Sequence, residues 1–172
     1  MPAWSKQPGP GPSGYGQPSR FVANIQRDPG RANPLYPGGG ASRTPLHQLR
    51  GTITPNGLHF ERHHAGVPEI DPAAHTLFIN GLVERPLAFD YESLLRYPMV
   101  SRTQFLECSG NSGALFRDAA VDGTAQSING LVSCAEWTGI PLSVLLDEAG
   151  VSPEARWISA VGADAASMGR SI

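Results

Sequence analysis

The sequence Phe105-Leu-Glu-Cys-Ser-Gly-Asn-Ser-Gly113 joins an apolar stretch to a loop of small residues. Ser101 to Cys108 has the aromatic and aliphatic content of a strand, and the serines, glycines and asparagine that follow favour a turn. A cysteine at this junction projects from the strand end beside free backbone N–H groups, which can stabilise a thiolate. A lone cysteine is otherwise most often a small buried hydrophobic residue. The stretch therefore predicts a strand that presents Cys108 as either a functional or a packed thiol.

Further strands are expected on both sides of this stretch. Thr76 to Val83 has the pattern of a strand interrupted near Gly81, and Arg156 to Val161 that of another. Thr44 to Phe60 contains a Pro-Asn-Gly turn with β-type residues around it, which predicts a hairpin-like entry.

Two short helices are expected between the strands. Asp90 can cap a helix over Tyr91 to Arg96, which Pro98 ends. Ile140 to Gly150 has proline in its first turn and a glycine suited to the left-handed cap. The residues expected to share one face of this helix are Leu142, Leu145, Leu146 and Ala149. Rossmann spacing and phosphate-binding glycine loops are absent from the sequence, so we expect a mixed α+β domain with long irregular connections.

The first 43 residues differ in composition from the rest. Of the 36 glycines and prolines in the chain, sixteen fall in residues 1 to 40. Such a segment buries too little apolar surface to offset the cost of ordering its backbone, so residues 1–43 should lack helices and strands. They are expected to form either a disordered leader or an extended arm on the folded body. The candidate anchors for an arm are Trp4, Tyr15, Phe21 and Tyr36.

Charge and cysteine content exclude several classes of protein. A net charge of −2 provides no basic excess for nucleic acid, and no apolar run is long enough for a membrane span or marks a signal peptide. Two cysteines are too few for a disulfide scaffold or a four-cysteine zinc module. Cys134 is expected to have a packing role, and a Cys108–Cys134 disulfide is the alternative.

A histidine-rich segment, Phe60-Glu-Arg-His-His-Ala-Gly-Val-Pro68, is the second candidate site. A histidine metal site formed with His59 is disfavoured, because the adjacent His63 and His64 would point in different directions on a strand. Arg62 among neutral histidines instead suggests a pocket for an anion. The alternative is a solvated polar loop.

Four segments, taken in order, resemble the sulfite oxidase family of molybdenum enzymes. Phe60 to Pro68 and Glu107 to Asn111 are similar to its pterin-binding and metal-cysteine motifs. Gly130 to Gly139, and Gly162 to Asp164 followed by Arg170 to Ile172, are similar to later segments. Four ordered matches make the resemblance much stronger than any single motif does.

Within that family, the resemblance is closest to SoxC, the molybdenum subunit of sulfane dehydrogenases, and covers about residues 42 to 172. It implies a mixed α+β sulfite-oxidase-like fold. The expected organisation is a Pro/Gly-rich extended arm over 1–43 and the N-terminal part of an oxidoreductase molybdopterin-binding domain over 44–172. Family members continue with more of this domain and an immunoglobulin-like dimerisation domain. The resemblance therefore implies a chain truncated at its C-terminus, and an oligomer at full length.

The resemblance also implies roles for individual residues. Cys108 would be the thiolate ligand of molybdenum, where a soft donor helps to set the metal's potential. Arg62 would be a second catalytic residue, bringing positive charge to an anionic sulfur substrate. His63 stands where sulfite oxidases commonly have asparagine. The residues implied to bind the molybdopterin are Phe60, Glu61, Arg62, His63, His64 and Asp164.

The implied activity is two-electron oxidation of a sulfane sulfur carried on a cysteine of a SoxYZ-like carrier protein, with oxygen-atom transfer from molybdenum. The chain has no Cys-x-x-Cys-His haem motif, so the electrons are expected to pass to a c-type cytochrome subunit similar to SoxD. The family implies a periplasmic location. Two alternatives are a sulfite dehydrogenase of the same family and a non-catalytic binding module that lacks the cofactor.

Overall fold

The computed structural model describes residues 2–6, 8–30 and 38–162. Asp164, Tyr36 and the segment 170–172 lie outside these residues. Within them, the strands form three two-stranded antiparallel sheets, connected by short helices, 3-10 turns and irregular segments. The mixed α+β class expected from the sequence is confirmed.

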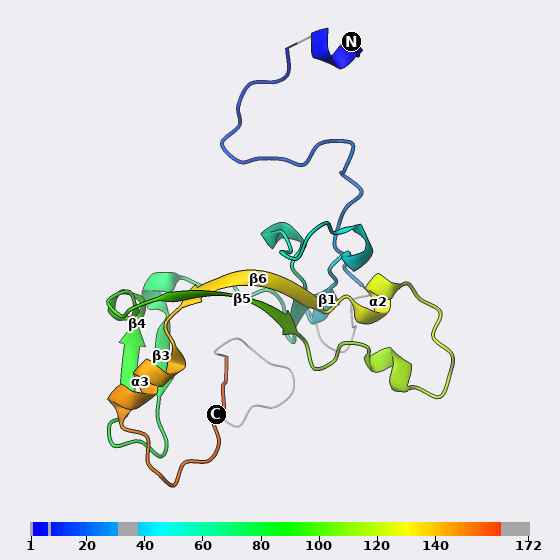
Figure 1. Ribbon diagram of the computed structural model, residues 1–172. Helices are drawn as coiled ribbons and strands as arrows, with labels where there is room; N and C mark the ends of the chain where they lie inside the picture. Colours follow the sequence, from blue (N-terminus) through cyan, green and yellow to red (C-terminus); the bar gives the residue numbers. More distant parts are fainter. Residues whose placement is uncertain (1, 7, 31–37, 163–172) are drawn as a thin grey trace.

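The longest element is a ribbon of two strands that arches across the molecule (Figure 1). It consists of β5, Val100–Glu107, and β6, Val132–Gly139, paired antiparallel along their full lengths. The strand expected to end at Cys108 is confirmed to within one residue. Its partner β6 was not expected.

The hydrophobic core lies at one end of this ribbon. A hairpin of β3, Thr76–Ile79, and β4, Leu87–Asp90, packs there with helices α1, Tyr91–Leu94, and α3, Leu142–Ala149. The buried residues of this core are Ile79, Phe89, Leu145 and Ala149. The apolar faces of the hairpin and of the helices thus bury each other. Neither the hairpin nor these short helices would be stable without this contact.

Both helix ends noted in the sequence have their expected conformations. The Asp90 side chain accepts a hydrogen bond from the Ser93 N–H at 2.7 Å and caps α1. Gly150 ends α3 with φ of 68°, and a Cβ there would lie 2.9 Å from the Glu84 carboxylate. Only glycine combines this backbone conformation with so close a neighbour.

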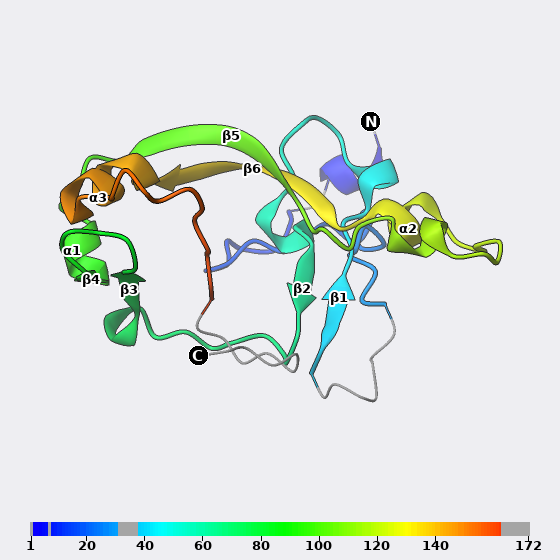
Figure 2. The same ribbon diagram turned by 90° about the horizontal axis from the view of Figure 1, so that it is seen from below.

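The other end of the ribbon carries a small sheet and helix α2, Ala125–Asn129 (Figure 2). The sheet pairs β1, Gly40–Ser42, with β2, Glu61–His63. Asp28 then forms an antiparallel bridge with Arg43, so the first segment of the chain lies against this sheet. The 3-10 turns are Ala3–Lys6, Leu46–Gln48, Asn56–Leu58, Pro72–Ala74 and Gly113–Phe116.

Two expectations for the first 43 residues are wrong. The segment contains a 3-10 turn and a strand, β1. The backbone N–H and carbonyl groups of β1 are paired with those of β2, so the strand forms although its own side chains are small. Tyr15 and Phe21 are not anchors, since they are 84% and 79% exposed. The Trp4 side chain and Tyr36 lie outside what the structure describes. The contacts described for this segment are polar and backbone contacts, such as the Asp28–Arg43 bridge and the Arg27–Glu61 ion pair.

Two predicted strand arrangements are also wrong. The Pro-Asn-Gly sequence forms the turn Asn56–Leu58, but no hairpin closes across it, because β2 pairs with β1 instead. The described residues 156 to 162 contain no strand, and Trp157 there is 94% exposed. An apolar pattern forms a strand only where a neighbouring backbone supplies partners. Among the described residues, no helix is long and apolar enough to span a bilayer.

Candidate molybdopterin site

Cys108 lies directly after β5, at the first residue of a tight loop. Its backbone N–H donates to the Leu131 carbonyl at 3.0 Å, and its carbonyl accepts from the Asn111 N–H at 2.8 Å. The Gly110 N–H lies 3.4 Å from the Cys108 sulfur and donates to it. The thiol is half-buried. Cysteine binds metals as the thiolate, and this backbone N–H gives the sulfur a hydrogen-bond donor.

Asn111 holds this loop in place from within. Its side-chain carbonyl accepts from the Leu131 N–H at 3.0 Å, and its amide donates to the Glu107 carboxylate at 2.9 Å. Ser112 follows with φ of 59°, the one non-glycine residue described with a positive φ. Its hydroxyl donates to the Asn129 side chain at 2.7 Å. The asparagine of the cysteine motif, to which the sequence assigned no role, therefore fixes the position of Cys108.

The second cysteine is separate from this site. Cys134 pairs with Phe105 within the β5–β6 ribbon, and both cysteines are free thiols. Its backbone N–H and carbonyl bond the hydroxyl and N–H of Thr54 at 3.2 and 2.8 Å. The alternative of a Cys108–Cys134 disulfide is therefore wrong, and Cys134 is a partly buried free thiol whose packing role stays a prediction.

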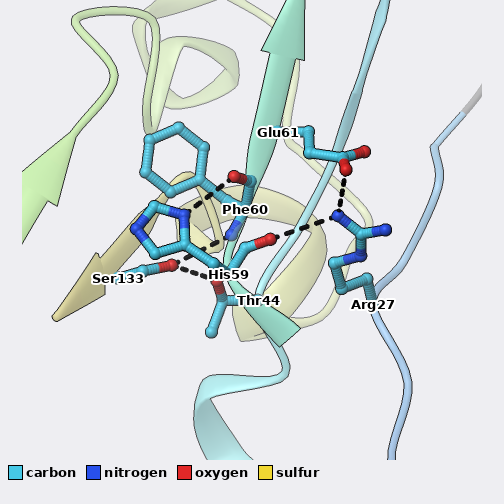
Figure 3. Close-up of polar contacts among 6 residues, drawn as sticks. All are labelled: Arg27, Thr44, His59, Phe60, Glu61 and Ser133. Carbon is cyan, nitrogen blue, oxygen red and sulfur yellow. Dashed lines mark hydrogen bonds and ion pairs between the residues drawn. The ribbon is translucent and has the colours of Figure 1, made fainter. Parts of the chain in front are cut away.

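The histidine-rich motif begins at a buried polar contact (Figure 3). The Phe60 N–H donates to the Ser133 hydroxyl at 3.0 Å, and that hydroxyl lies 2.6 Å from the hydroxyl of Thr44. Thr44 is fully buried and Ser133 is 2% exposed. The His59 ring stacks on Phe60 and meets the edge of Trp137. None of these supporting residues could be recognised locally, because Ser133 is 73 residues from Phe60.

Strand β6 brings the two motifs together. Cys108 is bonded to Leu131, the residue before β6, and Phe60 is bonded to Ser133 within β6, so the two contacts lie two positions apart along the chain. Two residues of a strand span roughly 7 Å. The structure therefore places the start of the histidine motif and the cysteine on one short piece of backbone, although 48 positions separate Phe60 from Cys108 in the sequence.

The side chains of the residues after Phe60 contact different parts of the structure. Glu61 forms an ion pair with Arg27 of the first segment, at 2.5 Å. Arg62 is exposed and donates to the backbone carbonyls of Gly40 and His63, so its guanidinium lies along the β1–β2 sheet. His63 is half-buried at the end of β2, and His64 follows it.

Two histidine nitrogens in this region are suited to an additional polar ligand. Nε2 of His59 and Nε2 of His63 are buried and have no hydrogen-bond partner among the described residues. A buried polar atom without a partner is unfavourable, so such atoms commonly mark a place where a ligand completes the contacts. Within the described residues, no three His, Cys, Asp or Glu side chains gather into a metal-binding group. A pterin carries several hydrogen-bond donors and acceptors, so it supplies partners of the kind that these nitrogens lack.

The comparisons with known proteins identify the family. The family model named "Oxidoreductase molybdopterin binding domain" matches residues 64–172. The chain therefore belongs to the molybdopterin-binding oxidoreductases, as its motifs predicted.

A solved structure shares both fold and sequence with the chain. The crystal structure of the sulfane dehydrogenase SoxCD from Paracoccus pantotrophus matches with a TM-score of 0.85 and 42% identity, over 96% of this chain and 43% of that one. The similarity to SoxC expected from the sequence is confirmed.

Curated relatives come from two further groups of enzymes. The nitrate reductase [NADPH] of Phytophthora infestans is 36% identical over 68% of this chain, and the sulfite oxidase of Gallus gallus is 35% identical over 59% of it. The chain spans 13% of the length of the first relative and 22% of the second. The similarity therefore concerns one part of these larger enzymes.

Proposed function

We propose that this chain forms part of a molybdenum enzyme that oxidises a sulfane sulfur bound to a carrier-protein cysteine. A c-type cytochrome subunit accepts the electrons, and the reaction takes place in the periplasm. The observation that carries the proposal is the geometry of Cys108, a half-buried thiol that receives a backbone N–H and is held beside the histidine motif. The similarity to the sulfane dehydrogenase SoxCD supports the choice of substrate and of partner.

The cofactor, when bound, supplies two-electron redox chemistry at sulfur. The chain would provide Cys108 as the sulfur ligand, and the Gly110 N–H donates a hydrogen bond to that sulfur. His63 offers its buried Nε2 to the pterin. Phe60, Glu61 and His64 belong to the same segment and are the other residues proposed to contact the pterin. Arg62 and Asp164 remain proposed contributors, the first through its exposed positive charge.

The overall reaction balances with water as the source of oxygen and the cytochrome as the electron acceptor. Each step adds one oxygen from water to the terminal sulfur and releases two protons and two electrons. Two one-electron reductions of a c-type haem take up these electrons. Water must therefore reach the site in every cycle, and a protein-bound sulfur needs an open approach to Cys108.

Substitution of the cysteine tests the cofactor assignment. The full-length protein should contain stoichiometric molybdenum by mass spectrometry and release a fluorescent pterin on denaturation. Cys108→Ser should lose molybdenum and turnover, because a neutral hydroxyl is a poor ligand for the metal. Cys134→Ser is the matched control and should retain both. Normal activity in Cys108→Ser would refute the proposal, and absence of pterin from the wild-type protein would favour a non-catalytic binding module.

A sulfite dehydrogenase is the second candidate, favoured by the similarity to the sulfite oxidase of Gallus gallus. Reduction of a c-type cytochrome should be followed with carrier-bound persulfide and with free sulfite as alternative substrates. Faster turnover of the persulfide supports the first proposal, and faster turnover of sulfite supports the second. Nitrate should be included as an oxidant, since nitrate reductases are also among the relatives.

A further inference from the structure

A contact from outside the cofactor-domain match holds the histidine motif. Arg27 lies in the Pro/Gly-rich segment, and its Nη1 forms the ion pair with Glu61 at 2.5 Å. The same nitrogen donates to the His59 carbonyl at 3.3 Å. One guanidinium therefore contacts the residues immediately before and after Phe60 (Figure 3). On the other side, Phe60 is bonded to Ser133 of the ribbon.

The segment that carries Arg27 is itself fixed on both sides of that residue. The Asp28 N–H and carbonyl bond the Arg43 carbonyl and N–H at 3.0 and 2.7 Å. The Gln26 carbonyl accepts from the Gln126 side chain at 3.2 Å. An exposed ion pair is normally weak because ordering two long side chains opposes it. Here the backbones of Arg27 and Glu61 are already held, by the bridge at Asp28 and by β2, so less freedom is lost on pairing.

We propose that Arg27 is a positioning residue for the molybdopterin site: its contacts with Glu61 and His59 hold the Phe60–His63 backbone in the form that binds the pterin. The inference rests on the proposed function, because it assigns that cofactor to the histidine motif. The first segment is then a part of the cofactor site rather than a passive leader. Its effect should be seen in how long the pterin stays bound.

The test compares pterin release from variants of the full-length holoprotein. Release is followed by pterin fluorescence after dilution, with molybdenum content measured in parallel. Arg27→Gln and Glu61→Gln should each release the pterin about fivefold faster, the upper range for a partly exposed ion pair. Arg20→Gln is the matched control, an arginine of the same segment that contacts the Phe21 ring, and should leave release unchanged. Arg27→Lys keeps the charge and should restore slow release at least in part.

A double variant separates a specific contact from general loss of structure. If Arg27 acts through Glu61, Arg27→Gln with Glu61→Gln should release no faster than either single variant. Raised ionic strength should speed release from the wild type and not from Arg27→Gln. The Arg27 and Glu61 side chains are 29% and 36% exposed, so dissolved salt screens their ion pair. Additive effects, no rescue by lysine, or equal release from the Arg27→Gln and Arg20→Gln variants would each overturn the inference. Wild-type protein without pterin would refute the proposed function and this inference with it.

Discussion

The Asn111 side chain attaches the cysteine loop to the β5–β6 ribbon by two hydrogen bonds. Its side-chain carbonyl accepts from the Leu131 N–H, just before β6, and its amide donates to the Glu107 carboxylate at the end of β5, so one side chain connects the loop to both strands. An alanine at this position would leave the Leu131 N–H without its partner. The sulfur would then lose its fixed position relative to the histidine motif.

We therefore expect Asn111→Ala to lower stability by roughly 1–3 kcal/mol, the usual consequence of leaving a partly buried donor unpaired. Molybdenum content should fall, although Cys108 remains. Ser109→Ala, a neighbouring exposed position, serves as the control and should change neither. Chemical denaturation and metal analysis give the two readings. An Asn111→Ala protein with full stability and full molybdenum content would contradict this role.

At the scale of an element, helix α1 depends on one exposed carboxylate. Hydrogen bonds from Ser93 lower the pKa of Asp90 below its ordinary value of 3.8. A carboxyl whose pKa is lower in the folded chain stabilises the fold above its unfolded pKa. This contribution is lost as the pH falls through the lower, folded value.

Asp90→Asn should therefore flatten the acid end of the stability profile. The asparagine can still cap the helix but has no charge to lose, so wild type and variant should converge as the pH falls below the ordinary aspartate pKa. Thermal unfolding followed by circular dichroism at several acidic pH values measures this. A constant difference between the two proteins over that range would show that ionisation of Asp90 contributes nothing to stability.

At the scale of the whole molecule, the core and the candidate site lie at opposite ends of the β5–β6 ribbon (Figures 1 and 2). Leu145 of α3 is 3% exposed and belongs to the core, whereas Leu142 of the same helix is 48% exposed. The sequence predicted both on one face of the helix. Leu142 is the first residue of α3 and is not among the residues that pack against the core.

Leu145→Ala should lower the free energy of unfolding by about 2–5 kcal/mol, while Leu142→Ala should change it by no more than about 0.5 kcal/mol. Because the core is remote from Cys108, molybdenum content per folded chain should stay at the wild-type level in both. Denaturant unfolding and metal analysis of the folded fraction test this. Loss of molybdenum in folded Leu145→Ala protein would show that the two ends of the ribbon are coupled.

Local features of the chain were predictable because they depend on residues close in sequence. Asp90 caps a helix that begins at the next residue, and Gly150 ends one at the residue before it. The same holds for the strand that leads to Cys108, and for the motifs that identified the family. Each involves a few neighbouring residues whose side chains or φ angles decide the outcome.

The assembly of the candidate site was decided only in the tertiary structure. The pairing of β1 with β2, the contact of Phe60 with Ser133 and the ion pair of Arg27 with Glu61 join residues far apart in the sequence. Strand pairing offers many registers of similar local quality, and a single polar residue carries no mark of its distant partner. The sequence alone therefore identified Cys108 and the histidines as the chemical groups of the candidate site. Their arrangement around β6 depends on long-range backbone hydrogen bonds and buried polar contacts, which only the tertiary structure shows.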